Sequence, residues 1–284
     1  MTKTHNLREL LASPNVLIAP CAYDALSAKM IEATGFSLAG TTGYGMHGAM
    51  LGVPDNGMLA FNEVASALGN IASAVGIPVM ADAEGGYGNA INTIRTVREF
   101  EKTGIAGLFI EDQKLPPNCP YFKQTEMISI EEMVGKIKAA IDTRVDRDFV
   151  IVARTDAPFE EAIERCNAYA EAGADMVKAI PTNRQELEAF PERIKAPLHL
   201  GFAHGKGVSD GLTAYDAGKM GYKIVTFPFT CLFANTKSVL DVLRILKENG
   251  TDEPATNAML SIEAYFDFIG ADYYRTLERK YLPD

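Results

Sequence analysis

The chain has 284 residues, 47% of them hydrophobic, and a formal net charge of −10. This length suits one large core, and barrels of alternating strands and helices often have about 250 residues. The acidic balance disfavours a nucleic-acid partner, because the phosphate backbone binds basic surfaces. No apolar run approaches the ~18 residues of a membrane span, and the first residues lack the apolar core of a secretory signal.

Eight short apolar runs follow one another along the chain, each typical of a parallel strand buried on both faces. Amphipathic helical patterns separate these runs, and several of the helices end at a glycine, as at Gly35, Gly76 and Gly104. Eight such units predict an α/β protein with a closed (β/α)8 barrel of TIM type. The predicted strands are residues 16–20, 38–42, 78–84, 107–112, 149–155, 176–181, 198–203 and 223–229.

Charged residues stand where three consecutive predicted strands end. Asp82 and Glu84 end the third strand, Glu111 lies in the end of the fourth, and Arg154 and Asp156 lie at the end of the fifth. The active site of such a barrel lies at the carboxyl ends of its strands, so we expect these side chains to lie together. Clustered carboxylates can hold a hard divalent cation, and an arginine can clamp a substrate carboxylate or phosphate in a two-point fork. The residues predict a metal-assisted enzyme that acts on a small anion.

Each of these acids has an alternative interpretation as the cap of the following helix. Three acids and an arginine on neighbouring strands favour the metal site over three separate caps. Asp55, in LGVPDNG, is either a further acid of this site or a turn residue after proline. Asp156 fits better as a residue that orients Arg154, or as a helix cap, than as a chemical participant.

Three loops beside the predicted site carry candidate residues. The GTTGYG loop, residues 40–45, offers backbone N–H groups and the Thr42 hydroxyl to an anion, which by itself is a weak signal. The loop of residues 115–124 could close as a lid, and its Cys119 is either an acid or base or an inert thiol. His204 lies after the seventh strand, where barrels often bind phosphate or carboxylate.

The four cysteines, at positions 21, 119, 166 and 231, are widely spaced. No two form a C-x-x-C pair, so the sequence predicts neither a disulfide framework nor a structural zinc site. Apart from Cys119, their strand or helix context indicates core positions. A reducing cytoplasm fits this usage best.

We divide the chain into a catalytic barrel, residues 1–250, and a C-terminal helical extension, residues 251–284. The extension carries apolar side chains at helical spacing, namely Ile262, Tyr265, Phe266, Phe268 and Ile269. This is more apolar surface than one exposed terminal helix should present to water. We therefore expect the extension to pack on a neighbouring subunit of a homo-oligomer.

In combination these segments resemble the isocitrate lyase / phosphoenolpyruvate mutase superfamily over nearly the whole chain. The segment DAEGGYGN resembles the D-x-D-x-G-[YF]-G motif of that family, and IEDQ and ARTDA resemble its glutamate-containing strand end and its substrate arginine. Similar matches are PCAYDALSAKMIEATGF to the opening strand and helix, and TTGYGMHGAMLGVPDNG to the substrate loop. The tail FIGADYYRTLERKY resembles the C-terminal helices, which are commonly swapped between subunits. The resemblance implies a homotetramer built as a dimer of such swapped dimers.

The resemblance also implies a divalent cation, Mg²⁺ or Mn²⁺ in its place, with an α-keto acid or its enolate bound to it. Asp82 would coordinate the metal directly or through water, with Glu84, Glu111 and Asp55 around it. The substrate part of the site would be formed by Thr42, Gly43 and Tyr44 at the keto-acid end, with Arg154 neutralising the enolate, Cys119 serving in proton transfer and His204 near the substrate.

Four departures from the family pattern concern the substrate. The lid reads PNCPY in place of K-[KR]-C-G-H, so it keeps Cys119 and loses the basic pair and the Gly-His. The second acid of the D-x-D motif is Glu84, Ile180 stands where a substrate-binding glutamate is usual, and Gly201 stands where an asparagine is usual. The metal half of the expected site is intact, and the half that holds the rest of the substrate is rebuilt.

We therefore predict a Mg²⁺-dependent carbon–carbon lyase, similar to 2-methylisocitrate lyase or to carboxyphosphonoenolpyruvate mutase-like members of the superfamily. It would cleave a small 2-hydroxy di- or tricarboxylate by retro-aldol chemistry through an enolate of an α-keto acid. The alternatives are a phosphonomutase, a phosphonopyruvate hydrolase, or an oxaloacetate decarboxylase or hydrolase on the same enolate platform. A third hypothesis is a ligand-binding barrel without catalysis. The rebuilt lid and Ile180 favour this hypothesis, and the intact acids argue against it.

Overall fold

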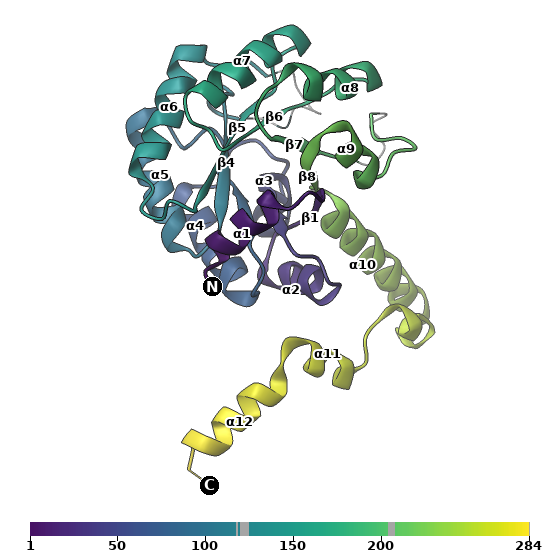
Figure 1. The fold of residues 1–284 in the computed structure, drawn as a ribbon. Helices are drawn as coiled ribbons and strands as arrows, with labels where there is room; N and C mark the ends of the chain where they lie inside the picture. Colours follow the sequence, from purple (N-terminus) through teal and green to yellow (C-terminus); the bar gives the residue numbers. More distant parts are fainter. Residues whose placement is uncertain (118, 120–124, 204–207, 284) are drawn as a thin grey trace. The chain divides into compact units, whose positions relative to one another are not determined.

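A closed barrel of eight parallel strands forms the centre of the first of two compact units, Met1–Leu232 (Figure 1). The computed structural model describes residues 1–117, 119, 125–203 and 208–283. Each strand pairs with the next along the chain, and β8 closes the barrel on β1. The strands are β1 Leu17–Ala22, β2 Ala39–Thr41, β3 Val79–Asp82, β4 Gly107–Glu111, β5 Val150–Thr155, β6 Met176–Ala179, β7 Leu198–Gly201 and β8 Tyr222–Phe227.

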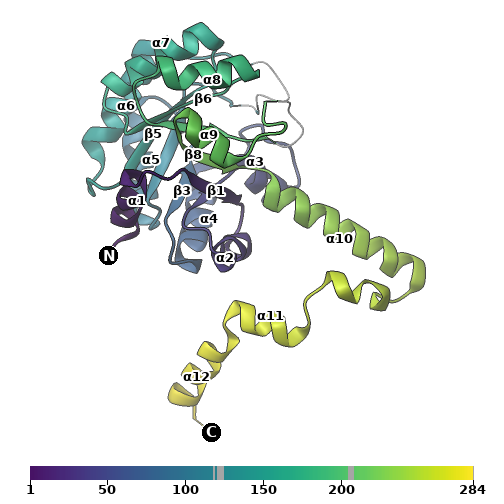
Figure 2. The ribbon, with the colours of Figure 1, turned by 45° about the vertical axis from the view of Figure 1, so that its right-hand side comes forward.

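Helices surround the barrel and connect each strand to the next (Figure 2). After β2 the connection has three parts, the short helix α3, a π-helical turn η1 and the long helix α4. The predicted (β/α)8 barrel is confirmed, and every predicted strand boundary agrees with the structure within two residues. The helices of this unit are α1 Lys3–Ala12, α2 Ala25–Ala33, α3 Gly43–Met46, η1 His47–Leu51, α4 Phe61–Ala74, α5 Ala90–Lys102, α6 Ile130–Thr143, α7 Phe159–Glu171, α8 Arg184–Arg193 and α9 Ala214–Met220.

Two apolar clusters position the site. The larger fills the layer between the strands and the surrounding helices, and the smaller fills the interior of the barrel. The interior cluster includes Leu17, Met80 and Met176, and Phe109 of β4 also belongs to it. Phe109 pairs in register with Asp82, the last residue of β3. Polar residues therefore begin where the apolar filling of the barrel stops, at the carboxyl ends of the strands.

At the end of β4, successive side chains point to opposite faces of the sheet, which separates a residue of the site from a structural one. Glu111 faces the barrel interior, and the next residue, Asp112, is held on the helix side by α7. The carboxylate of Asp112 accepts a hydrogen bond of 2.7 Å from the Tyr169 hydroxyl and one of 3.1 Å from Nη1 of Arg165. These buried contacts fix the strand end from outside, because a buried carboxylate needs partners that satisfy its charge.

The second unit, Phe233–Asp284, contains most of the long helix α10, Thr230–Asn249, followed by the 3-10 segment Glu253–Ala258. Two further helices follow, α11 Ile262–Ile269 and α12 Ala271–Tyr281. Neither buries a single residue within this chain. Their exposed apolar side chains include Ile262, Tyr265, Phe266, Tyr273 and Tyr274. The domain boundary at residue 250 and the packing of the extension on a neighbour stay predictions.

Within the described part of the chain, no helix combines the length and the apolar character needed to cross a bilayer. All four cysteines are free thiols.

Candidate active site

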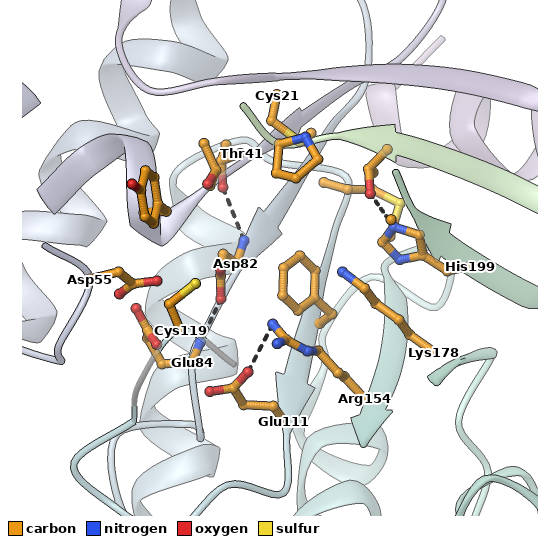
Figure 3. Close-up of a pocket in the computed structure, with 18 of the residues that line it drawn as sticks. Cys21, Thr41, Asp55, Asp82, Glu84, Glu111, Cys119, Arg154, Lys178 and His199 are labelled. Carbon is orange, nitrogen blue, oxygen red and sulfur yellow. Dashed lines mark hydrogen bonds and ion pairs between the residues drawn. The ribbon is translucent and has the colours of Figure 1, made fainter. Parts of the chain in front are cut away.

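A pocket lies at the carboxyl ends of the strands, inside the first unit (Figure 3). It collects residues from all eight strands and from loops that follow them. The four acids predicted for the metal site and the predicted arginine all line it, namely Asp55, Asp82, Glu84, Glu111 and Arg154.

Asp82 is held in one orientation by backbone groups. Its Oδ2 accepts a hydrogen bond of 3.2 Å from the N–H of Gly43, and its Oδ1 accepts one of 3.0 Å from the N–H of Glu84. A Cβ atom at position 43 would lie 2.7 Å from Oε1 of Glu84 and 3.3 Å from Oδ2 of Asp82. Only a glycine at position 43 therefore lets the start of α3 approach these two carboxylates so closely. The Gly43 N–H that we expected to face the substrate serves Asp82 in this structure.

Burial, together with repulsion between the acids, raises the pKa values of three of them. Burial raises the pKa of Glu84 well above its usual range, and the charges of Asp82, Glu111 and Asp55 raise it further. Burial also raises the pKa of Glu111 to about 8 and that of Asp55 to about 6, in the latter case with help from Asp82. Like charges gather this closely in protein interiors when a cation compensates them. The oxygen-only donor set fits a hard divalent ion.

Arg154 is the cation already beside the acids. Its Nη1 lies 2.9 Å from Oε2 of Glu111, and its Nε and Nη2 form a two-point fork on Asp156 at 2.9 and 2.8 Å. Burial alone would lower the pKa of Arg154, but Asp156 and Glu111 raise it well above its usual range. The prediction that Asp156 orients Arg154 is confirmed. Of the five N–H donors of a guanidinium, two remain for a substrate carboxylate.

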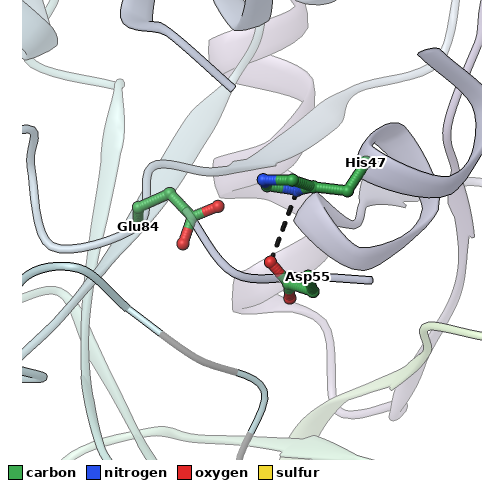
Figure 4. Close-up of side chains that lie close together, drawn as sticks. All are labelled: His47, Asp55 and Glu84. Carbon is green, nitrogen blue, oxygen red and sulfur yellow. Dashed lines mark ion pairs between the residues drawn. The ribbon is translucent and has the colours of Figure 1, made fainter. Parts of the chain in front are cut away.

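His47 belongs to the site and was missed by the sequence reasoning. One ligand atom each of His47, Asp55 and Glu84 lie within 4.8 Å of one another, as in a metal site (Figure 4). Both nitrogens of the imidazole already have partners, however. Nε2 accepts a hydrogen bond of 3.2 Å from the N–H of Leu59, so Nδ1 carries the proton. Nδ1 donates to the carbonyl of Gly43 at 2.8 Å and also lies 3.4 Å from Oδ1 of Asp55. His47 therefore positions Asp55 and is not a free metal ligand.

The predicted substrate loop is partly helical. Thr42 caps α3 by accepting from the N–H of Gly45 at 3.4 Å, and it lines the pocket together with Tyr44, whose ring packs edge-on against Phe229. Cys119 also lines the pocket and is 5% exposed. His204 lies outside the described residues. The substrate-binding roles of Thr42, Gly43, Tyr44, Arg154 and His204, and the catalytic role of Cys119, stay predictions.

A sequence profile of the family described as phosphoenolpyruvate phosphomutase matches residues 7–246. The chain belongs to this family. The predicted resemblance to the isocitrate lyase / phosphoenolpyruvate mutase superfamily is thus confirmed.

Several relatives in the family are named as lyases. The chain is 39% identical to a 2,3-dimethylmalate lyase of Eubacterium barkeri over 286 residues, which cover 99% of each chain. It is 38% identical to a 2-methylisocitrate lyase of Aeropyrum pernix, with 94% of this chain and 87% of that one covered. Among solved structures, a phosphonopyruvate hydrolase in complex with oxalate and Mg²⁺ superimposes with a TM-score of 0.90 at 31% identity over 100% of both chains. The prediction that the chain belongs to an enzyme family with carbon–carbon lyases is confirmed.

The lower part of this pocket is polar. Lys178 of β6, His199 of β7 and Thr226 of β8 line it beneath the acids, together with Cys21. The sequence reasoning did not assign Lys178, His199 or Thr226 to the site; Cys21, predicted as a core residue, is buried and also lines the pocket. The available signal was a lysine and a histidine inside strand segments that are otherwise apolar, MVKA and LHLG. Ile180 and Gly201, two of the departures noted in the sequence, line the same pocket.

Proposed function

We propose that the protein is a Mg²⁺-dependent carbon–carbon lyase that cleaves a small 2-hydroxy di- or tricarboxylate by retro-aldol chemistry and releases an α-keto acid. The observation that carries this proposal is the cluster of Asp55, Asp82, Glu84 and Glu111 around one arginine at the barrel end. The two relatives at 39% and 38% identity, which are named as lyases, support it.

Asp82 would hold the metal, with Glu84, Glu111 and Asp55 around it as ligands or as acceptors for metal-bound waters. Mn²⁺ could replace Mg²⁺ in such a set, because both prefer oxygen donors. When bound, the ion would supply Lewis-acid stabilisation of the negative charge that develops on the keto-acid fragment. His47 would keep Asp55 turned toward the acids through its contact at 3.4 Å.

The chain's own groups would perform the remaining tasks. The two remaining N–H donors of Arg154 would bind the substrate carboxylate and stabilise developing negative charge beside it. The hydroxyls of Thr42 and Tyr44 line the same part of the pocket and would orient the keto-acid end. As the substrate hydroxyl gives its proton to a base in the site and the C–C bond breaks, the hydroxyl carbon becomes the keto carbon of the product. The other carbon of the broken bond keeps the electron pair. Cys119 would give that carbon its proton.

Two alternatives on the same site are supported by other neighbours. The match to phosphonopyruvate hydrolase favours cleavage of a P–C bond. An oxaloacetate acetylhydrolase superimposes with a TM-score of 0.92 at 28% identity, which favours oxaloacetate chemistry. We prefer the lyase because the lid keeps a cysteine, which the family's lyases use in proton transfer.

A substrate screen with Mg²⁺ tests this proposal. We expect hydroxy-diacids or hydroxy-triacids to yield a keto acid, detected by NMR, with turnover lost on chelation and restored by Mg²⁺. Phosphate released from phosphonopyruvate, or oxalate or CO₂ from oxaloacetate, in the absence of lyase turnover would select one of the alternatives. Absence of any turnover, combined with binding of these acids, would instead support a ligand-binding barrel.

We also propose that the extension, residues 251–284, holds subunits of a homotetramer together. Its exposed apolar side chains on α11 and α12 motivate this, since apolar surface of that extent is stabilised when a second subunit covers it. A chain that ends at Thr251 should scatter light as a smaller species, or aggregate, while far-UV circular dichroism shows that the barrel is retained. An oligomer of unchanged size and solubility would contradict this role. The free thiols fit a reducing cytoplasm as the compartment.

A further inference from the structure

The ammonium group of Lys178 is a buried charge that faces the pocket. The residue is 8% exposed and lines the pocket, with Nζ 4.7 Å above the ring centroid of Phe109. Among the described residues, no carboxylate lies within ion-pair distance of it and no hydrogen bond satisfies it. Burial, followed by the neighbouring Arg154, lowers the pKa of Lys178 to about 8, while the charge of Asp82 acts in the opposite direction. An unpaired buried charge is costly, and proteins keep one where a ligand completes it.

His199 supplies a second unsatisfied group at the same place. It is 1% exposed, and its Nε2 lies 3.0 Å from Oγ1 of Thr226. The Thr226 hydroxyl donates its only proton to the carbonyl of Leu200 at 3.2 Å, so His199 must donate through Nε2. Its Nδ1 is therefore an acceptor, and this atom is buried without a partner. This unpartnered nitrogen belongs to a ring near Lys178, because the charge of Lys178 adds to burial in lowering the pKa of His199.

Space for a ligand group exists above these residues. A Cβ atom at Gly201 would already lie 3.8 Å from Nζ of Lys178 and 3.7 Å from Oγ1 of Thr226. Any longer side chain at position 201 would occupy the space over the ammonium. Figure 3 shows Lys178 directed into the middle of the pocket, with His199 beside it.

The two cations of the pocket differ in their pairing. Arg154 forms ion pairs with Glu111 and Asp156, whereas Lys178 forms none with the described residues. We propose that Lys178 forms a second anion subsite that binds an additional carboxylate of the substrate. This inference rests on the proposed function and names the residue that would bind the second carboxylate of its substrate. The same amine would equally attract a phosphonate, so the test includes both groups.

Binding of matched ligands in the presence of Mg²⁺ tests the subsite by calorimetry. Malate carries a carboxylate where 2-hydroxybutyrate carries a methyl group, while oxalate fills only the metal half. A charge-assisted hydrogen bond contributes about 1.5–3 kcal/mol, so the parent should bind malate roughly 10- to 100-fold more tightly than 2-hydroxybutyrate. Lys178→Met should remove this preference by lowering the affinity for malate, and it should leave the affinity for oxalate unchanged. Lys219→Met, the same change at an exposed lysine of α9, should alter neither.

Stability separates this role from a structural one. Because Lys178→Met removes an unpaired buried charge, the ligand-free variant should unfold at the same or a higher temperature than the parent. Unfolding at a clearly lower temperature would show that the ammonium is paired in the free protein and would overturn the subsite. So would a malate preference that survives in Lys178→Met, or a reduced imine at Lys178 after treatment with pyruvate and borohydride.

The outcomes also distinguish a failure of this inference from a failure of the proposed function. If oxalate and Mg²⁺ do not bind the parent, the proposed function is wrong and the subsite falls with it. If they bind and malate has no advantage, the subsite alone is wrong. A preference for phosphonopyruvate over malate that is lost in Lys178→Met would overturn the carboxylate and assign the subsite to a phosphonate.

Discussion

Replacement of Asp82 by alanine should lower turnover on the order of 10³-fold or more, because electrostatic stabilisation by a metal contributes several kcal/mol. Asp82 affects the pKa values of the three other acids of the site. Its charge raises the pKa of Asp55, Glu84 and Glu111. Backbone N–H groups of Gly43 and Glu84 fix both of its oxygens. Loss of this carboxylate should remove the metal while the barrel, whose core lies below, remains folded.

Thermal-shift titrations with Mg²⁺ and oxalate measure this effect without a known substrate. The parent should gain stability from the two ligands together, since anything that binds only the folded state stabilises it. Asp82→Ala should gain little at the same concentrations. Asp142→Ala serves as the matched control, because Asp142 is an exposed acid of α6. An equal stabilisation of Asp82→Ala and the parent would remove Asp82 from the metal site.

The barrel and the metal half of the site could be predicted because local signals encode them. A parallel strand buried on both faces must be apolar throughout, and an acid at its carboxyl end has few structural reasons to be there. Asp82 and Glu111 satisfy both conditions, and β3 and β4 are neighbours in the barrel. Their proximity therefore followed from strand order alone, without knowledge of the register.

The lower half of the pocket could not be predicted in the same way. Side chains along β6 alternate between the barrel interior and the helices, and the sequence does not show which of them face inward. The structure places Met176 in the interior cluster, so Lys178, two residues later, also faces the interior. The same holds for His199 on β7. For His47 the limit is different, because its partners Asp55 and Leu59 reach it only through the π-helical turn after β2. No spacing in the sequence signals that turn.

Cys119 is the proposed proton donor, and the residues that flank it differ from those of the related lyases. Its thiol is buried and lines the pocket, and its proximity contributes, after burial, to the raised pKa of Tyr44. This places the sulfur within the same pocket as the predicted keto-acid site. The basic pair and the Gly-His that accompany this cysteine in related lyases are replaced by PNCPY. A thiol without those cations has less reason to ionise, which suits a proton donor better than a base.

If Cys119 gives the proton to the cleaved fragment, Cys119→Ser should reduce kcat by ~10²-fold or more with little change in KM. General acids act in the transition state, so ground-state binding of the substrate should be preserved. Cys231→Ser is the matched control, since Cys231 lies in α10 and its thiol is only partly buried. The measurement follows the substrate screen and uses the hydroxy acid with the highest turnover. Near-parental kcat in Cys119→Ser would show that another group delivers the proton, and would shift the balance toward the phosphonate or oxaloacetate chemistry, which needs no thiol at this position.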